Sequence, residues 1–184
     1  MNFKALLLAA GLGTRLKPLT NDIPKCLVRL GNEPILGIWL KNLSKAGCES
    51  VLINTHYLSN QVEDYLKKKD FGNMQIITSY EPKLLGTAGT LIKNANFFLG
   101  GNSMFIHADN FTKTNLQAFM HFHVKNTVPK KKLLTMMTFK TDNPNPFSIT
   151  LCHVLLSSMW NWSVVDPPIV RMIPLCKVSL LYGR

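Results

Sequence analysis

The chain has 184 residues, the size of one domain, and a formal net charge of +11. Hydrophobic residues make up 46% and charged residues 17%, which excludes a disordered or low-complexity chain. No apolar run approaches the roughly 18 residues of a membrane helix, and the short run at 5–10 leads into glycines instead of a cleavage site. We therefore expect a globular protein of the cytoplasm, whose four widely spaced cysteines are reduced.

The positive charge is spread along the chain, with two short lysine clusters at 67–69 and 130–132. A basic balance suits a nucleic-acid binder, but it also suits a protein that handles small polyphosphates. No aromatic residues interleave the lysines, as a platform for stacking bases would require. We expect solvated lysine faces and neither a nucleic-acid nor a membrane partner, with RNA binding as the weaker alternative.

The first half of the chain begins with a continuous apolar run at 3–9 that ends at glycines, as expected for a strand buried on both faces. From 34 to 46 the apolar residues fall at helical spacing, and Gly47 then ends the helix. The segment 51–54 predicts a second strand. Ser59 is the expected N-cap of a helix that runs to Lys69.

The same alternation continues beyond that helix. Further strands are predicted at 74–77, 104–107 and 133–139, and further helices at 87–95 and 114–124. Strands alternating with helices predict an α/β fold, a Rossmann-like, doubly wound and mostly parallel sheet. In such sheets ligands bind beyond the carboxyl ends of the strands.

The last stretch of sequence differs in kind. Residues 147–184 contain one acidic residue, Asp166, and one glycine, Gly183, and their apolar residues follow no regular period. We therefore divide the chain into a core at 1–146 and an atypical tail at 147–184.

The most informative segment is LLLAAGLGTRLKPLT at 6–20, where a buried strand leads into a loop. Gly11 and Gly13 let the backbone approach a ligand and point N–H groups at phosphates, and Arg15 and Lys25 add cations nearby. The P-loop pattern is absent, and Leu16 replaces the third glycine of the dinucleotide fingerprint. By itself the loop is equally compatible with a plain strand–helix turn.

The wider pattern is more specific. GLGTRLKPLT, followed by PKCL at 24–27 and PIL at 34–36, resembles the signature of the sugar-phosphate nucleotidylyltransferases. EPKLLGTAGTL at 81–91 and HADN at 107–110 follow in the order of that family, so the resemblance covers residues 1 to about 144. HADN and the later TMMTF are most similar to the mannose-1-phosphate guanylyltransferase and glucose-1-phosphate thymidylyltransferase branches. The resemblance implies the nucleotide-diphospho-sugar transferase-like form of the fold.

The resemblance also implies a reaction, in which a hexose 1-phosphate attacks the α-phosphorus of a nucleoside triphosphate and pyrophosphate leaves. Arg15 and Lys25 would be the catalytic cations on the phosphates, and Asp109 would ligate the Mg²⁺ cofactor. Gly86, Thr87 and Ala88 would lie against base and ribose. The full implied nucleotide-binding set is Leu8, Ala10, Gly11, Gly13, Thr14, Arg15, Gly86, Thr87, Ala88 and Asp109.

The family pattern stops after Pro146. The expected Glu-Lys pair, whose lysine grips the sugar phosphate, and a second metal-binding aspartate are not found; the tail offers only Lys177 and Asp166 in unrelated surroundings. We hypothesise a reading-frame shift near codon 146, which translation of the gene in its other frames would test. The fold would then be truncated, and the alternative to an enzyme is a catalytically inactive nucleotide-binding fragment. The base, the sugar and the oligomeric state stay open.

Overall fold

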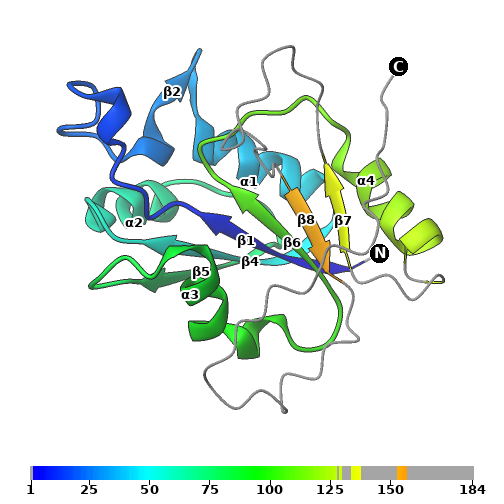
Figure 1. Cartoon of the computed structure of the whole chain (residues 1–184). Helices are drawn as coiled ribbons and strands as arrows, with labels where there is room; N and C mark the ends of the chain where they lie inside the picture. The colour runs from blue at the N-terminus through cyan, green and yellow to red at the C-terminus, as the bar shows by residue number, and fades with distance from the viewer. Residues whose placement is uncertain (1, 128, 130–133, 138–152, 157–184) are drawn as a thin grey trace, which may run out of the picture.

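The apolar run near the start of the chain forms a central strand of a six-stranded sheet (Figure 1). The structure is a computed structural model that describes residues 2–127, 129, 134–137 and 153–156. The strand order is β5-β4-β1-β6-β8-β7. The strands of this sheet are β1 (Phe3–Leu8), β4 (Cys48–Thr55), β5 (Gln75–Tyr80), β6 (Asn102–His107), β7 (Leu134–Met137) and β8 (His153–Leu156).

Four neighbouring strands, β5, β4, β1 and β6, run parallel, and β8 is antiparallel to both β6 and β7. In register, Leu8 at the end of β1 stands between Asn54 of β4 and His107 of β6. The parallel strands therefore end together at one edge. The expected doubly wound, mostly parallel sheet is confirmed.

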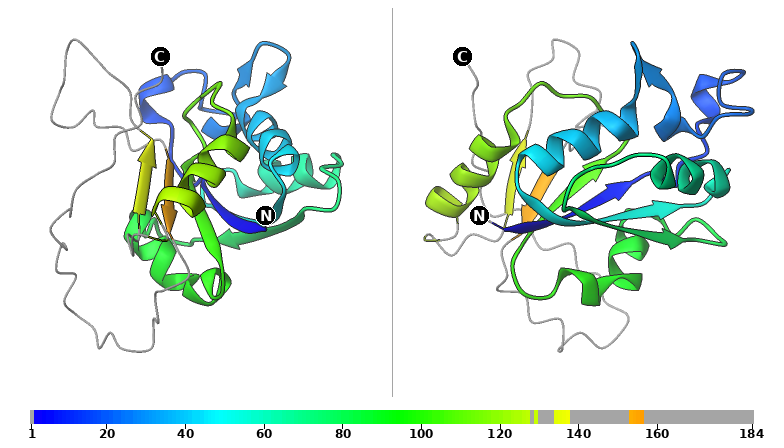
Figure 2. Two further views of the ribbon diagram at one scale, coloured as in Figure 1. Left: turned by 90° about the vertical axis from the view of Figure 1, so that its right-hand side faces the viewer. Right: turned by 180° about the vertical axis from the view of Figure 1, so that it is seen from behind.

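Helices cover both faces of the sheet, as the two views of Figure 2 show. In Figure 1, α1, α2 and α4 lie above the sheet and α3 lies below it. The helices are α1 (Ile35–Lys45), α2 (Ser59–Lys67), α3 (Gly86–Lys93) and α4 (Leu116–Phe122), and the shorter 3₁₀ turns are η1 (Thr14–Leu16), η2 (Lys25–Leu27) and η3 (Ala95–Phe98). Within the described residues no helix combines the length and the apolar character needed to cross a membrane.

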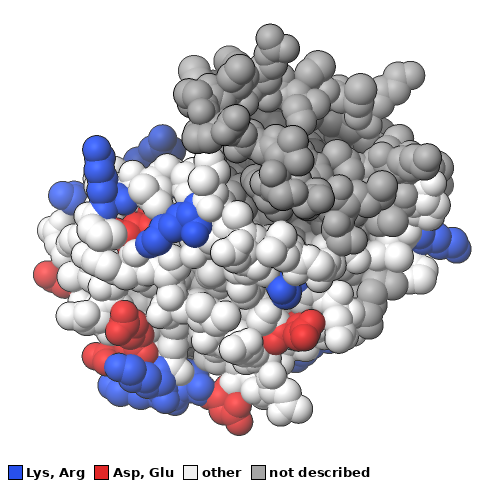
Figure 3. All heavy atoms as spheres, turned by 90° about the horizontal axis from the view of Figure 1, so that it is seen from below, with Lys and Arg blue, Asp and Glu red and all other residues white. Residues whose placement is uncertain are grey.

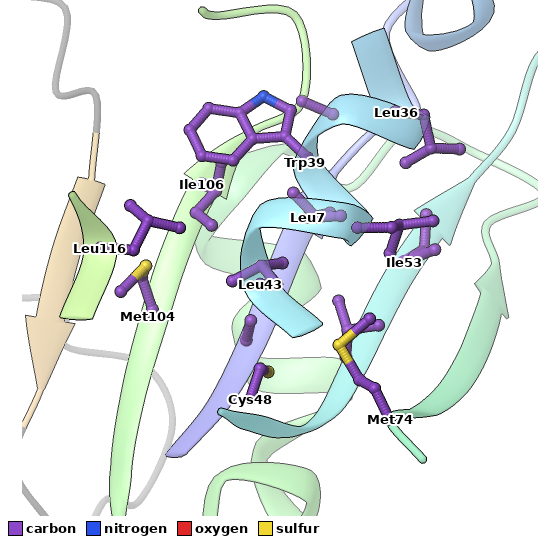
Figure 4. Close-up of a cluster of buried hydrophobic side chains, with 14 of the residues drawn as sticks. Leu7, Leu36, Trp39, Leu43, Cys48, Ile53, Met74, Met104, Ile106 and Leu116 are labelled. Carbon is purple, nitrogen blue, oxygen red and sulfur yellow. The ribbon is translucent and has the colours of Figure 1, made fainter. Parts of the chain in front are cut away.

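The larger of two hydrophobic clusters fills the space between the sheet and α1, α2 and α4 (Figure 4). Leu7, Ile53 and Ile106 come from three adjacent strands and meet Trp39 and Leu43 of α1. On the opposite face a smaller cluster joins the sheet to η3; its buried members are Leu6, Leu52, Phe98 and Phe105. Alternate residues of one strand thus enter different cores, as a strand buried on both faces requires.

Three local features differ from the sequence prediction. Ser59 is the first residue of α2 and not its N-cap, because Leu58 precedes it in a left-handed conformation at φ 51° and no side chain caps the helix. Pro34, the expected start of the first helix, lies instead with Glu33 in the two-stranded hairpin of β2 (Arg29–Leu30) and β3 (Glu33–Pro34), and the helix begins at Ile35. Although its sequence has no strand period, the tail supplies β8, which pairs with β6, so the edge of β6 is not left unpaired. The rest of the 147–184 tail lies outside the described residues.

Charged side chains of both signs are interspersed on the face seen in Figure 3. The acidic residues lie between and beside the lysines and arginines, with uncharged surface around them. The described part of this face therefore shows no continuous basic field, although the chain as a whole carries +11.

Gly37 allows α1 to pack closely on its neighbours. A Cβ at this buried position would lie 2.1 Å from the Tyr65 hydroxyl oxygen and 2.5 Å from Glu33 Oε1. Those two groups are hydrogen-bonded to each other at 3.1 Å, and Lys41 holds the other carboxylate oxygen of Glu33 at 2.8 Å. The bond from Lys41 is the largest influence and lowers the pKa of Glu33; burial opposes it, and the bond from Tyr65 adds a smaller lowering effect. The missing side chain thus makes room for a polar contact between α1, β3 and α2.

We predict that Gly37→Ala destabilises the protein, although alanine is favoured over glycine by about 1 kcal/mol in a helix interior. The added methyl overpacks the site, which typically costs about 1–3 kcal/mol. Urea unfolding measures the change, and Tyr65→Phe, which removes the clashing hydroxyl, should recover part of it in the double variant. A more stable Gly37→Ala protein would contradict the close contact.

His123 is a buried titratable group far along the chain from the glycine loop. It is fully buried at the end of α4, its Nδ1 lies 2.8 Å from Thr135 Oγ1, and its Nε2 has no hydrogen-bond partner within the described residues. Burial lowers the pKa of His123 to about 4. The neutral imidazole is therefore the form that the folded protein holds.

We predict an acid-dependent loss of stability from this residue. The unfolded chain binds a proton near the ordinary histidine pKa of about 6.5, so stability falls as the pH drops from there toward 4, by on the order of 2–3 kcal/mol. His123→Gln should flatten that part of the dependence of unfolding free energy on pH, whereas His121→Gln, at an exposed neighbour, should leave it unchanged. An identical slope in His123→Gln would contradict the assignment.

Candidate functional site

A cleft of about 250 Å³ opens at the carboxyl ends of β1, β4 and β6, beside the segment that follows β5. This is the edge where ligands bind in open parallel sheets. Its lining comes from five separate stretches of the chain: Leu8, Ala9, Ala10, Gly11, Gly13, Lys25, Cys26, Asn54, Glu81, Leu84, Gly86, Thr87, His107, Ala108 and Asp109.

Most of the residues predicted for the site, the nucleotide-binding set together with the catalytic Lys25, share this cleft. Those on its lining are Leu8, Ala10, Gly11, Gly13, Lys25, Gly86, Thr87 and Asp109. Thr14, Arg15 and Ala88 are not on the lining. Arg15 lies on the exposed turn η1, directly beyond the loop, and makes no ion pair within the described residues.

The glycine loop has a conformation that needs glycine at one position. Gly13 adopts φ +67°, and a Cβ there would lie 2.9 Å from Thr20 Cγ2. The buried Thr20 hydroxyl donates to the Gly13 carbonyl at 2.7 Å and so fixes the end of the loop. The N–H groups of Gly11 and Leu12 donate no hydrogen bond within the described part of the chain. The loop therefore keeps backbone donors available for an anion.

Lys25 and Asp109 face each other across the cleft, and the ammonium is hydrogen-bonded to Asp109 Oδ2. About a third of each side chain is exposed, 30% and 33%. Asp109 follows β6, and the loop behind it is fixed where Trp39 Nε1 donates to the Asn110 carbonyl at 2.8 Å. Helix α1 thus supports the Asp109 carboxylate indirectly, by holding the backbone of Asn110.

Cys26, beside Lys25, lines the cleft but is buried. Burial raises the pKa of its thiol to about 12, more than the opposing backbone hydrogen bond lowers it. A neutral, buried thiol is a poor nucleophile, so Cys26 serves as an apolar anchor for η2 and not as a reactive group.

Asn54, Glu81 and Thr90, none of them predicted from the sequence as a site residue, form a buried hydrogen-bonded cluster against the cleft. Asn54 Oδ1 accepts from the backbone N–H of Ala9 at 2.7 Å and of Ala10 at 3.3 Å. Asn54 Nδ2 donates to Glu81 Oε1 at 3.0 Å and to Thr90 Oγ1 at 3.2 Å. A polar residue near the end of an otherwise apolar strand, and a motif that begins with Glu81, were the available signals.

The pKa of Glu81 is lowered even though its side chain is fully buried. Burial is the largest influence and raises the pKa, but hydrogen bonds from Thr90, Asn54 and the Leu85 N–H together outweigh it, with help from the charge of Lys93. Glu81 is therefore an ionised carboxylate whose charge is held by neutral donors.

The chemistry of the cleft fits a Mg²⁺ ion shared with a phosphate ligand. No group of three or more His, Cys, Asp or Glu side chains that could hold a metal occurs among the described residues. Mg²⁺ is commonly bound by one or two carboxylates, with phosphate oxygens and water completing the shell. Asp109 can supply that single carboxylate, whereas Glu81 is already occupied by its donors.

Comparison with known proteins matches residues 4–149 to the family model described as nucleotidyl transferase. The chain belongs to the nucleotidyl transferase family. It is 33% identical over 152 residues to mannose-1-phosphate guanylyltransferase catalytic subunit beta of Drosophila melanogaster, covering 80% of this chain and 40% of that protein. It is 36% identical over 105 residues to N-acetylmuramate alpha-1-phosphate uridylyltransferase of Caulobacter vibrioides, covering 55% and 43%.

Solved structures give the same fold. A putative glucose-1-phosphate thymidylyltransferase from Bacillus anthracis aligns with a TM-score of 0.70 at 18% identity, covering 85% of this chain and 72% of that one. CTP:phosphocholine cytidylyltransferase from Streptococcus pneumoniae aligns with a TM-score of 0.53 at 32% identity, covering 63% and 49%. The family expected from the sequence motifs is confirmed. This nucleotidyl transferase chain spans about 40% of the length of its curated guanylyltransferase relatives.

We predict that Asp109→Asn reduces the Mg²⁺-dependent part of nucleoside triphosphate binding while leaving the fold intact, because a neutral amide is a weak ligand for a hard cation. Calorimetric titration of triphosphate with and without Mg²⁺ measures the difference. Asp64→Asn, on the exposed face of α2, is the matched control. A Mg²⁺ dependence equal to that of the unaltered protein would remove Asp109 from the metal site.

Proposed function

We propose that this chain transfers a nucleotidyl group from a nucleoside triphosphate to a sugar 1-phosphate. The observation that carries the proposal is the cleft itself, in which the glycine loop and the Lys25–Asp109 pair meet at the carboxyl edge of the parallel strands. Membership of the nucleotidyl transferase family supports it.

In the proposed reaction an oxygen of the sugar 1-phosphate forms a bond to the α-phosphorus, and the bond from that phosphorus to the pyrophosphate oxygen breaks. Such a transfer needs positioning and charge neutralisation more than covalent catalysis. The N–H groups of Gly11 and Leu12, which have no partner among the described residues, would bind phosphate oxygens, and Lys25 would neutralise charge near the α-phosphate. Arg15, unpaired among the described residues and next to the loop, would hold the departing pyrophosphate.

Asp109 would hold Mg²⁺, which supplies a cation to screen the phosphate oxygens and orient them. Lys25 would keep the Asp109 carboxylate turned into the cleft before a ligand arrives. Gly86 and Thr87, at the start of α3, would lie along the nucleoside, where small side chains permit close approach.

The acceptor that we propose to test first is mannose 1-phosphate, with other hexose 1-phosphates beside it. The relatives are named for guanylyl, uridylyl and cytidylyl transfer, so the base has to be determined by titrating each triphosphate. We propose the cytoplasm as the compartment, where free buried thiols such as Cys26 and Cys48 persist.

Nucleotide binding without turnover is the second candidate. The sequence of 147–184 holds one lysine, Lys177, and one acid, Asp166, where the resemblance called for a lysine on the sugar phosphate and a second aspartate. A pyrophosphate-release assay with hexose 1-phosphates, run beside calorimetry with Mg²⁺ and each triphosphate, decides between the two. Binding with turnover supports the transferase, binding alone supports the second candidate, and no triphosphate binding contradicts both.

We predict that Arg15→Ala weakens triphosphate binding by about tenfold or more, since a charge-assisted hydrogen bond contributes roughly 1.5–3 kcal/mol. Arg15→Lys should recover only part of the affinity, because an ammonium lacks the planar fork of a guanidinium. Lys17→Ala, two residues along the same exposed loop, is the control for net charge. Unchanged affinity in Arg15→Ala would rule out the role assigned here.

A further inference from the structure

The N–H groups of Ala9 and Ala10 follow the last residue of β1, where the sheet no longer offers partners on the β4 side. On the other side the ladder continues, because Ala108 N–H donates to the Leu8 carbonyl at 3.1 Å. Asn54, paired with Leu8 in register, lends its side-chain oxygen to both N–H groups. One side chain therefore extends the hydrogen bonding past the strand and sets the direction in which the glycine loop leaves.

An asparagine side chain can present either its oxygen or its NH₂ to the loop, so something must orient it. Here the Glu81 carboxylate lies on the opposite side of the amide, at 3.0 Å from Nδ2. Glu81 is ionised and accepts only, so the NH₂ has to face it and the oxygen has to face Ala9 and Ala10. The buried Glu81 carboxylate, just after β5, thereby selects the Asn54 rotamer that holds the loop after β1.

The same carboxylate also fixes the opposite wall of the cleft. Its second oxygen, Oε2, accepts from the Leu85 N–H at 3.1 Å, at the entry to α3. The Thr90 hydroxyl lies 2.6 Å from Glu81 Oε1 and 2.9 Å from the Gly86 carbonyl. Glu81 is thus hydrogen-bonded directly to the wall formed by the start of α3, and through Asn54 to the wall formed by the glycine loop.

We propose that Asn54 is a positioning residue for the nucleotide cleft, held in its working orientation by Glu81 and Thr90. By holding Ala9 and Ala10, it keeps the next two N–H groups, of Gly11 and Leu12, turned toward the phosphates. The inference rests on the proposed function, because it assigns these residues a role in triphosphate binding. None of the three needs to touch the ligand.

The test combines a measurement without ligand and one with it, on the full chain. Hydrogen exchange followed by NMR should show faster exchange of the Ala9 and Ala10 amides in Asn54→Ala, while the Ala108 amide stays protected as an internal control. Calorimetry with Mg²⁺ and the preferred triphosphate should show an affinity about tenfold weaker, the effect of losing one well-placed hydrogen-bonding contact.

A conservative pair separates positioning from simple loss of packing. Thr90→Val keeps the shape but removes the hydroxyl, so it should weaken triphosphate binding, whereas Thr90→Ser keeps the hydroxyl and should restore affinity near that of the unaltered protein. This pair also serves if Asn54→Ala fails to fold. Urea midpoints of both Thr90 variants accompany the titrations, so that a loss of affinity is compared at known stability.

The outcomes are distinct. Weakened binding in Asn54→Ala and Thr90→Val, rescue in Thr90→Ser, and faster exchange confined to Ala9 and Ala10 support the positioning role. Triphosphate binding that stays unchanged in those variants overturns it while leaving the proposed function in place. If the unaltered chain binds no triphosphate, the proposed function fails and this inference fails with it, and the exchange data then show Asn54 to be a purely structural support of the loop.

Discussion

The site depends on how backbone hydrogen bonds are satisfied where β1 ends. A parallel strand must release its chain at the carboxyl edge, and the first N–H groups beyond the edge lose their ladder partners. Asn54 replaces those partners for Ala9 and Ala10, and Thr20 holds the far end of the loop at Gly13. Between these two attachments the N–H groups of Gly11 and Leu12 donate to no partner among the residues that the structure describes. Their availability to a ligand is a consequence of how their neighbours are bonded.

The two carboxylates on the cleft lining, Glu81 and Asp109, differ in burial and are therefore suited to different roles. Glu81 is fully buried and ionised, and its oxygens are occupied by neutral donors, so its charge serves to orient an amide and a helix start. About a third of the Asp109 side chain is exposed, and its partner is the ammonium of Lys25, which stands on a flexible side chain. An ion pair that water reaches is weak and can be exchanged for a better partner. Asp109 is therefore the carboxylate suited to a metal.

The glycine loop, the helices and the parallel strands could be predicted because their signals are local, as in the apolar run before Gly11. The cluster of Asn54, Glu81 and Thr90 could not, since the contacts of Asn54 join it to residues 27 to 45 positions away and depend on the register of β1 with β4. Strand β8 was also missed, because its four residues lie in a stretch without an alternating pattern and form a strand only against β6 and β7. Local periodicity carries no information about such distant partners.

The turn that follows the glycine loop differs from the helix that follows a phosphate-binding P-loop. In a P-loop the loop runs into a long helix, whose aligned peptide dipoles place positive charge at the phosphates. Here the loop enters η1, a 3₁₀ turn of three residues, which is too short to build a comparable dipole. Under the proposed function, positive charge beside this loop would come from side chains and from the Mg²⁺ proposed at Asp109. Arg15 lies on η1, directly after the loop, and Lys25 on η2 reaches the cleft from the next turn, so both are placed to supply positive charge that η1 does not.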